Sequence, residues 1–139
     1  MITFLKILFF SKSVWLAASP IDIEGQHTFQ LEEPVAAITS GAYLEIEATN
    51  LFGTALEVSD FQAVRERLPD SSIKATLVAE NGDIVELRFH GNISKVGNEI
   101  WIPLRTTNGV PTGLRFYRVD VYSNVRIEKS RVRWNNCRI

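Results

Sequence analysis

Turn-forming residues recur along the whole chain at intervals of about eight to twelve positions, and they divide it into short segments. An amphipathic helix needs about ten or more uninterrupted residues with helical periodicity, whereas a strand needs only about four to eight residues that alternate. The spacing therefore predicts an antiparallel, all-β fold. The dividing residues are Pro20, Gly25, Pro34, Gly41, Gly53, Pro69, Gly82, Gly91, Gly97, Gly109 and Gly113.

Length and composition are those of one globular domain. The chain has 139 residues, of which 45% are hydrophobic and 22% are charged. This supplies one hydrophobic core and argues against intrinsic disorder. We therefore expect residues 1–139 to form a single domain, an antiparallel two-sheet β-sandwich.

The segment around Gly82 predicts a β-hairpin whose register follows from its apolar residues. A two-residue loop would place apolar residues opposite polar ones, whereas a three-residue loop, 80–82, pairs the apolar residues of 73–77 with those of 85–89. A slip of one residue would move every side chain to the wrong face, so the pattern favours the three-residue loop. Gly82 would then adopt the left-handed conformation that the bulge of such a loop requires.

Alternation predicts the remaining strands. They are expected at 27–32, 42–48, 92–96, 99–105, 114–123, 125–128 and 131–134, with a hairpin turn at Gly97-Asn98. Ile100, Ile102 and Leu104 share a face, which leaves Trp101 on the opposite one. In 114–123, the alternation places Tyr117, Val119 and Val121 inward and Phe116, Arg118, Asp120 and Tyr122 outward.

One short helix is expected near 60–68. Ser59 and Gln62 have the spacing of a capping box, and Pro69 ends the segment. Between them, Phe61, Val64 and Leu68 fall on one side of a helix of two turns. Such a segment would connect two strands.

The closing segment FYRVDVYSNVRIEKSRVRW, residues 116–134, resembles the last strands of galactose-binding-like β-sandwich modules. In those modules two paired strands with alternating Val or Ile lead to a terminal aromatic residue. The resemblance covers about 20 residues and implies a jelly-roll-like topology. It implies no sugar site, because it matches no ligand-binding residue.

Two interpretations of residues 1–19 remain open. Met1–Phe10 is largely apolar, a polar Ser-Lys-Ser follows, and Ala18 precedes a possible cleavage point. The segment therefore reads either as a degenerate signal, which would make the protein periplasmic or secreted, or as two N-terminal strands of a cytoplasmic protein. The apolar run is too short for a transmembrane helix, so no stable membrane span is expected.

No motif identifies a catalytic, metal or cofactor site. Cys137 is the only cysteine, and no Gly-x-Ser-x-Gly accompanies His27 or His90. Asp22, Glu24 and His27 have a spacing that could hold a metal, and Glu45 and Glu47 could mimic a glycosidase pair, but both patterns are also typical of solvated strands. We therefore expect no cofactor and no catalysis.

Charge is distributed unevenly. The net charge of −1 gives no attraction to nucleic acid, but residues 1–70 carry ten acids and four bases, and residues 71–139 carry six acids and eleven bases. The excess of bases in the second half is either a set of solvated strand faces or a basic patch for an acidic partner.

The outward aromatic and basic residues lead to three functional hypotheses. The first is a protein-binding module, such as an inhibitor, an immunity protein or an accessory subunit. The second is a carbohydrate-binding module that stacks sugars on Trp101, and the third is an enzyme of unrecognised type. The candidate binding residues are Trp101, Phe116, Arg118, Tyr122, Arg126, Arg131 and Arg133.

Overall fold

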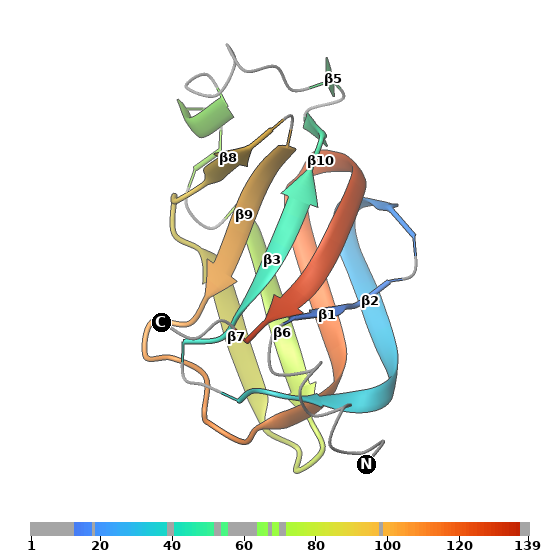
Figure 1. Ribbon diagram of the computed structural model, residues 1–139, viewed down its shortest axis with the longest axis vertical. Helices are drawn as coiled ribbons and strands as arrows, with labels where there is room; N and C mark the ends of the chain where they lie inside the picture. The colour runs from blue at the N-terminus through green and yellow to red at the C-terminus, as the bar shows by residue number, and fades with distance from the viewer. Residues whose placement is uncertain are drawn as a thin grey trace.

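In the computed structural model, most of the described residues lie in β-strands (Figure 1). It describes residues 13–17, 19–38, 41–51, 54–55, 64–66, 68–69, 72–97 and 99–136. The strands in these ranges are β1 (Ser13–Trp15), β2 (Ile21–Ala36), β3 (Tyr43–Ala48), β4 (Asn50–Leu51), β5 (Thr54–Ala55), β6 (Ile73–Ala79), β7 (Ile84–Phe89), β8 (Ser94–Val96), β9 (Glu99–Arg105) and β10 (Arg115–Asn135). The all-β prediction is therefore confirmed.

The strands form one continuous antiparallel sheet that closes into a five-stranded barrel. The ring runs β3–β9–β7–β6–β10 and returns to β3, because β10 pairs with both β6 and β3. This differs from the predicted two-sheet, jelly-roll-like sandwich. Two separate sheets would each have two edge strands. Here β10 pairs with both β3 and β6, and β7 pairs with β9, so these strands form a closed ring.

Closure depends on β10, which has 21 residues and changes direction along its length. Its first half lies between β2 and β6, so Val119 is opposite both Phe29 and Leu77. Its second half lies between β1 and β3, so Arg133 is opposite both Trp15 and Glu45. Figure 1 shows the strand bending over the end of the barrel between these halves.

Two buried serines stabilise the bend. The Ser123 hydroxyl donates to the Val125 carbonyl at 2.7 Å, and the Ser130 hydroxyl donates to the Ile21 carbonyl at 2.9 Å. Between them Lys129 has a φ of 51°, and its N–H donates to the Asp22 carboxylate at 2.9 Å. The predicted strands 114–123, 125–128 and 131–134 are therefore parts of one strand. The gaps between the predicted strands coincide with the register shifts at its bend.

The hairpin prediction is confirmed. Ala75 is opposite Leu87 and Leu77 is opposite Val85, as the three-residue loop requires. Gly82 has a φ of 90°, and its N–H donates to the Ala79 carbonyl at 3.1 Å. The hairpin of β8 and β9, with its turn at Gly97, is also as predicted.

The predicted outward position of Phe116 is wrong. Two residues of β10, Phe116 and Arg118, are opposite adjacent residues of β6, so Tyr117 is the extra residue of a bulge. The extra residue shifts the alternation of inward and outward side chains by one position. Phe116 therefore points into the core, where its side chain has no exposure. Tyr117, which was expected to point inward, is half-buried.

The core joins the two halves of β10. The rings of Phe116 and Trp134 meet edge to face with centroids 4.9 Å apart, and Trp134 has no exposure. The Trp134 indole donates to the buried Asn136 side chain at 3.0 Å. The same Asn136 oxygen accepts the Ile38 N–H at 3.0 Å, and its amide donates to the Ala36 carbonyl at 3.1 Å.

The helix and the N-terminus are described in part. Residues 64–66 are helical, and Val64 and Leu68 are buried on the same side as expected, whereas Ser59, Phe61 and Gln62 lie outside the described residues. At the N-terminus, Ser13–Trp15 forms β1, but residues 1–12 also lie outside the described ranges. No described helix is long and apolar enough to cross a membrane.

Candidate functional site

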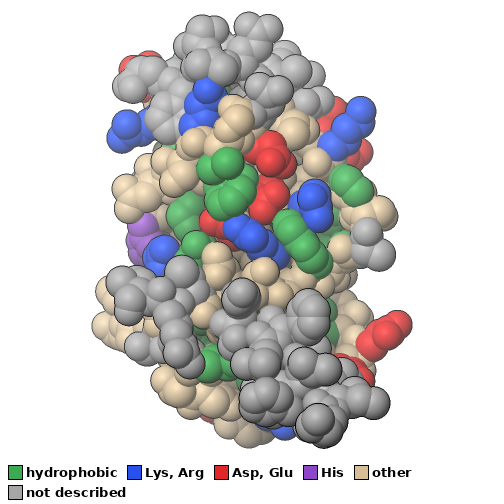
Figure 2. Space-filling model, viewed as in Figure 1, with side chains coloured by type: hydrophobic (Ala, Val, Ile, Leu, Met, Phe, Trp, Pro, Cys, Tyr) green, Lys and Arg blue, Asp and Glu red, His purple; other side chains and the backbone are tan. Residues whose placement is uncertain are grey.

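The outer surface of β9, β3, the second half of β10 and β1 carries a cluster of arginine–ring contacts around a buried ion pair. Cross-strand pairing places Trp101, Glu47 and Arg131 in one row. The next row contains Glu45, Arg133 and Trp15. We call this surface the aromatic–arginine face and define it by Trp15, Tyr43, Glu45, Glu47, Trp101, Arg105, Arg131 and Arg133. Figure 2 shows its charged side chains interleaved with hydrophobic ones.

At the centre of the face, two buried carboxylates share one guanidinium. Arg133 donates from Nε and NH2 to Glu45 Oε1, at 2.9 and 2.6 Å. Its Nε also lies 3.4 Å from Glu47 Oε2. The side chains of Glu45 and Glu47 are each only 6% exposed, and Arg133 is 17% exposed. The positive charge of Arg133 is thus neutralised internally, and one negative charge is left in excess.

This excess affects Glu47. Burial raises the pKa of the Glu47 carboxyl above its ordinary value, and the carboxylates of Glu99 and Glu45 raise it further. Arg133 and, more weakly, Arg131 act in the opposite direction. Glu45, by contrast, has the two short hydrogen bonds to Arg133 and a third contact of 3.4 Å with the Tyr43 hydroxyl.

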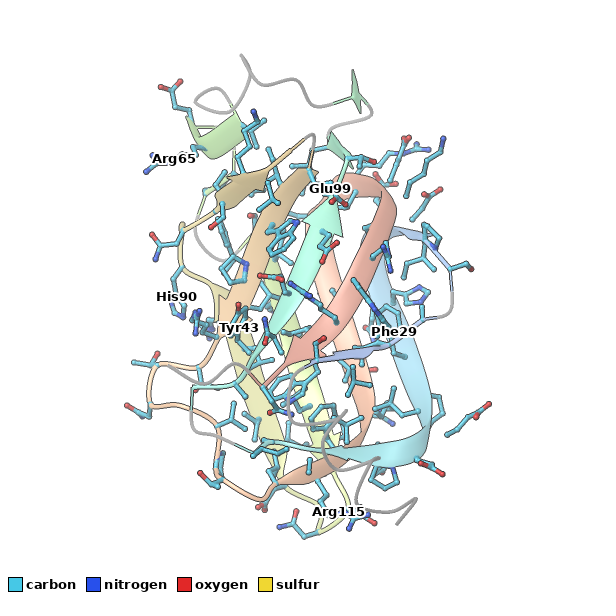
Figure 3. The ribbon with its side chains drawn as sticks, in the orientation of Figure 1. Phe29, Tyr43, Arg65, His90, Glu99 and Arg115 are labelled. Carbon is cyan, nitrogen blue, oxygen red and sulfur yellow. The ribbon has the colours of Figure 1, made fainter. Side chains whose placement is uncertain are left out.

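Three arginines stack on aromatic rings across this face. Arg131 lies 3.9 Å from the centroid of the Trp15 ring, and Arg105 lies 3.9 Å from that of Tyr43. Arg133 lies 4.7 Å from the Trp101 ring. Figure 3 shows Tyr43, which belongs to this set, and Glu99 at opposite ends of the paired strands β3 and β9. Such contacts hold the guanidinium groups in place without neutralising their charge.

Arg131 and Arg105 differ from Arg133 in forming no ion pair with the described residues, although Arg131 lies opposite Glu47 and acts weakly on its pKa. Both side chains are exposed, and neither forms an ion pair with a carboxylate of the described residues. Among the described residues, the Arg105 side chain has one hydrogen bond, a donation of 3.5 Å to the Gly41 carbonyl. Trp15, beneath Arg131, is 41% exposed. The face therefore presents two ordered, unpaired positive charges beside an exposed indole.

Of the seven residues predicted from the sequence, the fold brings three together. Trp101, Arg131 and Arg133 share the aromatic–arginine face. Phe116 is in the core. The remaining three, Arg118, Tyr122 and Arg126, lie on the first half of β10 or at its bend.

The two arginines among these three residues already have partners on their own strand. Arg126 pairs with Glu128 at 2.6 Å, and Arg118 pairs with Asp120 at 3.4 Å. Tyr122 is 42% exposed, and Lys74 lies 5.5 Å from its ring centroid. These residues thus belong to a different surface from Trp101.

That surface, on the outside of β2, β10 and β6, is hollowed. The hollow has a volume of about 300 Å³ and is lined by Gln26, Lys74, Ala75, Thr76, Asp120, Val121 and Tyr122. We call it the Tyr122 hollow. It lies on the opposite side of the core from the aromatic–arginine face, because Phe116 and Trp134 pack inward from the two halves of β10.

Sequence reasoning missed Trp15, Tyr43 and Arg105. The alternation of 99–105 places Arg105 on the same side as Trp101, which was a usable signal. No such signal existed for Trp15, because its place beside Arg133 depends on which edge of β10 accepts β1. The pairing of Glu45 with Arg133 joins residues 88 positions apart and also required the fold.

The candidate metal and catalytic residues have other contacts. Asp22 accepts the Lys129 N–H, His27 stacks on Phe29 with centroids 4.7 Å apart, and the His90 ring contacts the Arg105 carbonyl at 3.2 Å. Among the described residues, no group of three or more His, Cys, Asp or Glu side chains could hold a metal ion.

Comparisons of the chain with protein-family models, curated proteins and solved structures found no match. The resemblance of residues 116–134 to galactose-binding-like modules therefore stays a prediction. The two segments that carry it belong to the single strand β10 and pair with other strands instead of with each other.

Proposed function

We propose that this protein is a non-catalytic binding protein whose aromatic–arginine face docks an acidic segment of a protein partner. The observation that carries the proposal is the pair of exposed arginines, Arg105 and Arg131, each ordered by an aromatic ring and unpaired with any described carboxylate. An inhibitor, an immunity protein or an accessory subunit would each use such a surface.

Energetic reasons favour a protein partner at this face. Trp, Tyr and Arg are the residues that most often dominate protein interfaces. An arginine that is already stacked on a ring loses less conformational freedom when it pairs with a carboxylate, and its planar fork can bind both oxygens. The exposed ring of Trp15 adds apolar area next to the charge.

A sugar is a weaker candidate for the same face. Stacking requires an open ring surface, and Arg131 already contacts the Trp15 ring at 3.9 Å. Trp101 has Arg133 on its ring, and its indole N–H is buried without a hydrogen-bond partner among the described residues. A sugar would have to displace an arginine from either ring.

The test is affinity capture from the source cells with the full chain and two double variants of equal charge. R105A/R131A removes the two unpaired arginines. R115A/R126A is the matched control, because Arg115 and Arg126 are exposed and pair with Glu80 and Glu128. We expect a protein captured by the wild type to be retained by the control and to bind R105A/R131A at least about tenfold more weakly.

Two outcomes would contradict the proposal: a partner that binds both double variants equally, or the absence of any protein retained in a salt-dependent manner. Loss of a bound glycan in W101A, with R105A/R131A unaffected, would support the carbohydrate alternative instead. Because both arginines are exposed, circular dichroism should show an unchanged fold in both double variants.

A further inference from the structure

We propose that the Tyr122 hollow is a second binding site, which takes one neutral pyranose ring of a saccharide. The site is independent of the protein-binding face, because it lies across the core on the outer surface of β2, β10 and β6. Its floor is the backbone of Ala75 and Val121, whose side chains point into the core between the outward-facing rows.

Cross-strand register builds the hollow from two rows. Tyr122 lies between Gln26 of β2 and Lys74 of β6, and Asp120 lies between Thr28 and Thr76 on the same strands. Since side chains of one parity share a face, all six point outward. Register therefore fixes the aromatic ring, an amide, an ammonium, a carboxylate and hydroxyl groups around one depression.

Most of these polar groups are free to bind a ligand. The side chains of Gln26, Lys74 and Thr76 have no hydrogen bond or ion pair with the described residues. Asp120 accepts from Thr28 at 2.7 Å and pairs with Arg118 at 3.4 Å. These two contacts hold its carboxylate in position and still leave acceptor capacity.

The presence of both charge signs argues against a simple ion as the ligand. The ammonium of Lys74 and the carboxylate of Asp120 line the same hollow, so an anion would meet Asp120 and a cation would meet Lys74. A purely apolar ligand would leave these groups without water or partners. A neutral ligand with many hydroxyl groups and one apolar face satisfies both charges, and a pyranose has that composition.

The Tyr122 ring offers the surface on which such a sugar stacks. It is 42% exposed, and the nearest cation, Lys74 Nζ, lies 5.5 Å from its centroid. On the aromatic–arginine face the arginines lie nearer their rings, with Arg131 at 3.9 Å from the Trp15 centroid and Arg133 at 4.7 Å from the Trp101 centroid. A sugar ring would stack on Tyr122 by displacing the ammonium of Lys74, which lies farther from its ring than the arginines do from Trp15 and Trp101, with its hydroxyl groups toward Gln26, Lys74 and Asp120.

Saturation-transfer NMR on the full chain tests this site with a defined panel. The probes are glucose, galactose, mannose and xylose, with glucuronate and glucosamine as charged counterparts. We expect at least one neutral sugar to bind saturably, and to bind more tightly than its charged counterparts. Y122A should weaken binding at least about tenfold, Y122F should retain it within about threefold, and W101A should leave it unchanged.

Three results would overturn the proposal. They are no saturable binding of any neutral sugar, equal binding by wild type and Y122A, or loss of binding in W101A with Y122A unaffected. Y122F preserves the ring and the exposed position, so its comparison with Y122A separates loss of stacking from any effect on folding.

Discussion

Glu45 and Glu47 occupy neighbouring outward positions of β3, yet their replacement by glutamine should have different effects on stability. Glu45 accepts two hydrogen bonds from Arg133, at 2.6 and 2.9 Å, in a site where its side chain is 6% exposed. Glu47 has one longer contact with the same arginine, at 3.4 Å, and its pKa is raised by burial. Glutamine at 45 therefore weakens short hydrogen bonds to Arg133, whereas the folded protein tolerates a neutral group at 47.

The magnitudes follow from these contacts. A hydrogen bond to a charged group contributes about 1.5–3 kcal/mol, and glutamine retains one acceptor oxygen of the two that glutamate offers. Arg133 also keeps Glu47 as a second partner, which limits the cost of a broken buried pair. We expect E45Q to lower the free energy of unfolding by about 2 kcal/mol at pH 7. E47Q should leave it within about 0.5 kcal/mol or raise it.

The pH dependence gives a second, independent check. A carboxyl whose pKa is raised by folding contributes stability below its unfolded-state pKa, and this contribution is lost as the pH rises through the folded-state value. The wild type should therefore lose stability relative to E47Q as the pH increases from about 4 to 7. The two proteins should be most alike at the acidic end, where Glu47 is protonated in both the folded and the unfolded state.

Urea unfolding followed by tryptophan fluorescence measures both effects. The midpoints should shift while the dependence on urea stays constant, as expected for a change in stability alone. If E47Q destabilises the protein at pH 7 as much as E45Q does, the assignment of Arg133 to Glu45 is wrong. A wild-type stability that rises relative to E47Q between pH 4 and 7 would refute the raised pKa.

Two further substitutions test the fold. G82V should lower the free energy of unfolding by about 1 kcal/mol or more, measured by thermal melting, because Gly82 has a φ of 90°. The space around its Cβ position is empty, so a melting temperature that does not change would mean that the backbone is not strained by valine there. N136A should cost about 3 kcal/mol or more in urea unfolding, since the Trp134 N–H, the Ile38 N–H and the Ala36 carbonyl would lose a buried partner. A cost below 1 kcal/mol, roughly that of one ordinary hydrogen bond, would show that Asn136 does not organise this part of the core.

Local patterns predicted local structure well. The register of the hairpin at Gly82 followed from the apolar residues alone, because a slip of one residue would move every side chain to the opposite face of the sheet. The burial of Ile100, Ile102 and Leu104 followed in the same way. Each of these features depends on residues that are close together in the sequence and on a strict period of two.

The predictions of side-chain direction and strand boundaries failed where the two-residue alternation along β10 is interrupted. The bulge at Tyr117 inserts one residue into β10 relative to β6, and no residue type there marks it. The alternation was therefore continued through 116–118, and Phe116 was placed on the surface. At the bend, the predicted strands were interrupted after 123 and between 128 and 131, but the hydroxyl groups of Ser123 and Ser130 bond to backbone groups and allow the strand to continue.

The same bend explains why the seven candidate residues divide between two surfaces. Had 114–123 and 131–134 been neighbouring strands of one flat sheet, their outward residues would have formed one patch. Instead β10 folds over the end of the barrel, so Tyr122 faces away from one side of the core and Arg131 faces away from the other. An arginine-rich strand of this length therefore produces two surfaces with different chemistry.

Where β10 pairs with β2 and β6, its arginine Arg118 has an acidic partner, Asp120, whereas Arg131 beside β1 and β3 has an aromatic ring. Binding by charge is thus expected at the second half of β10, and binding by hydrogen bonds at the first.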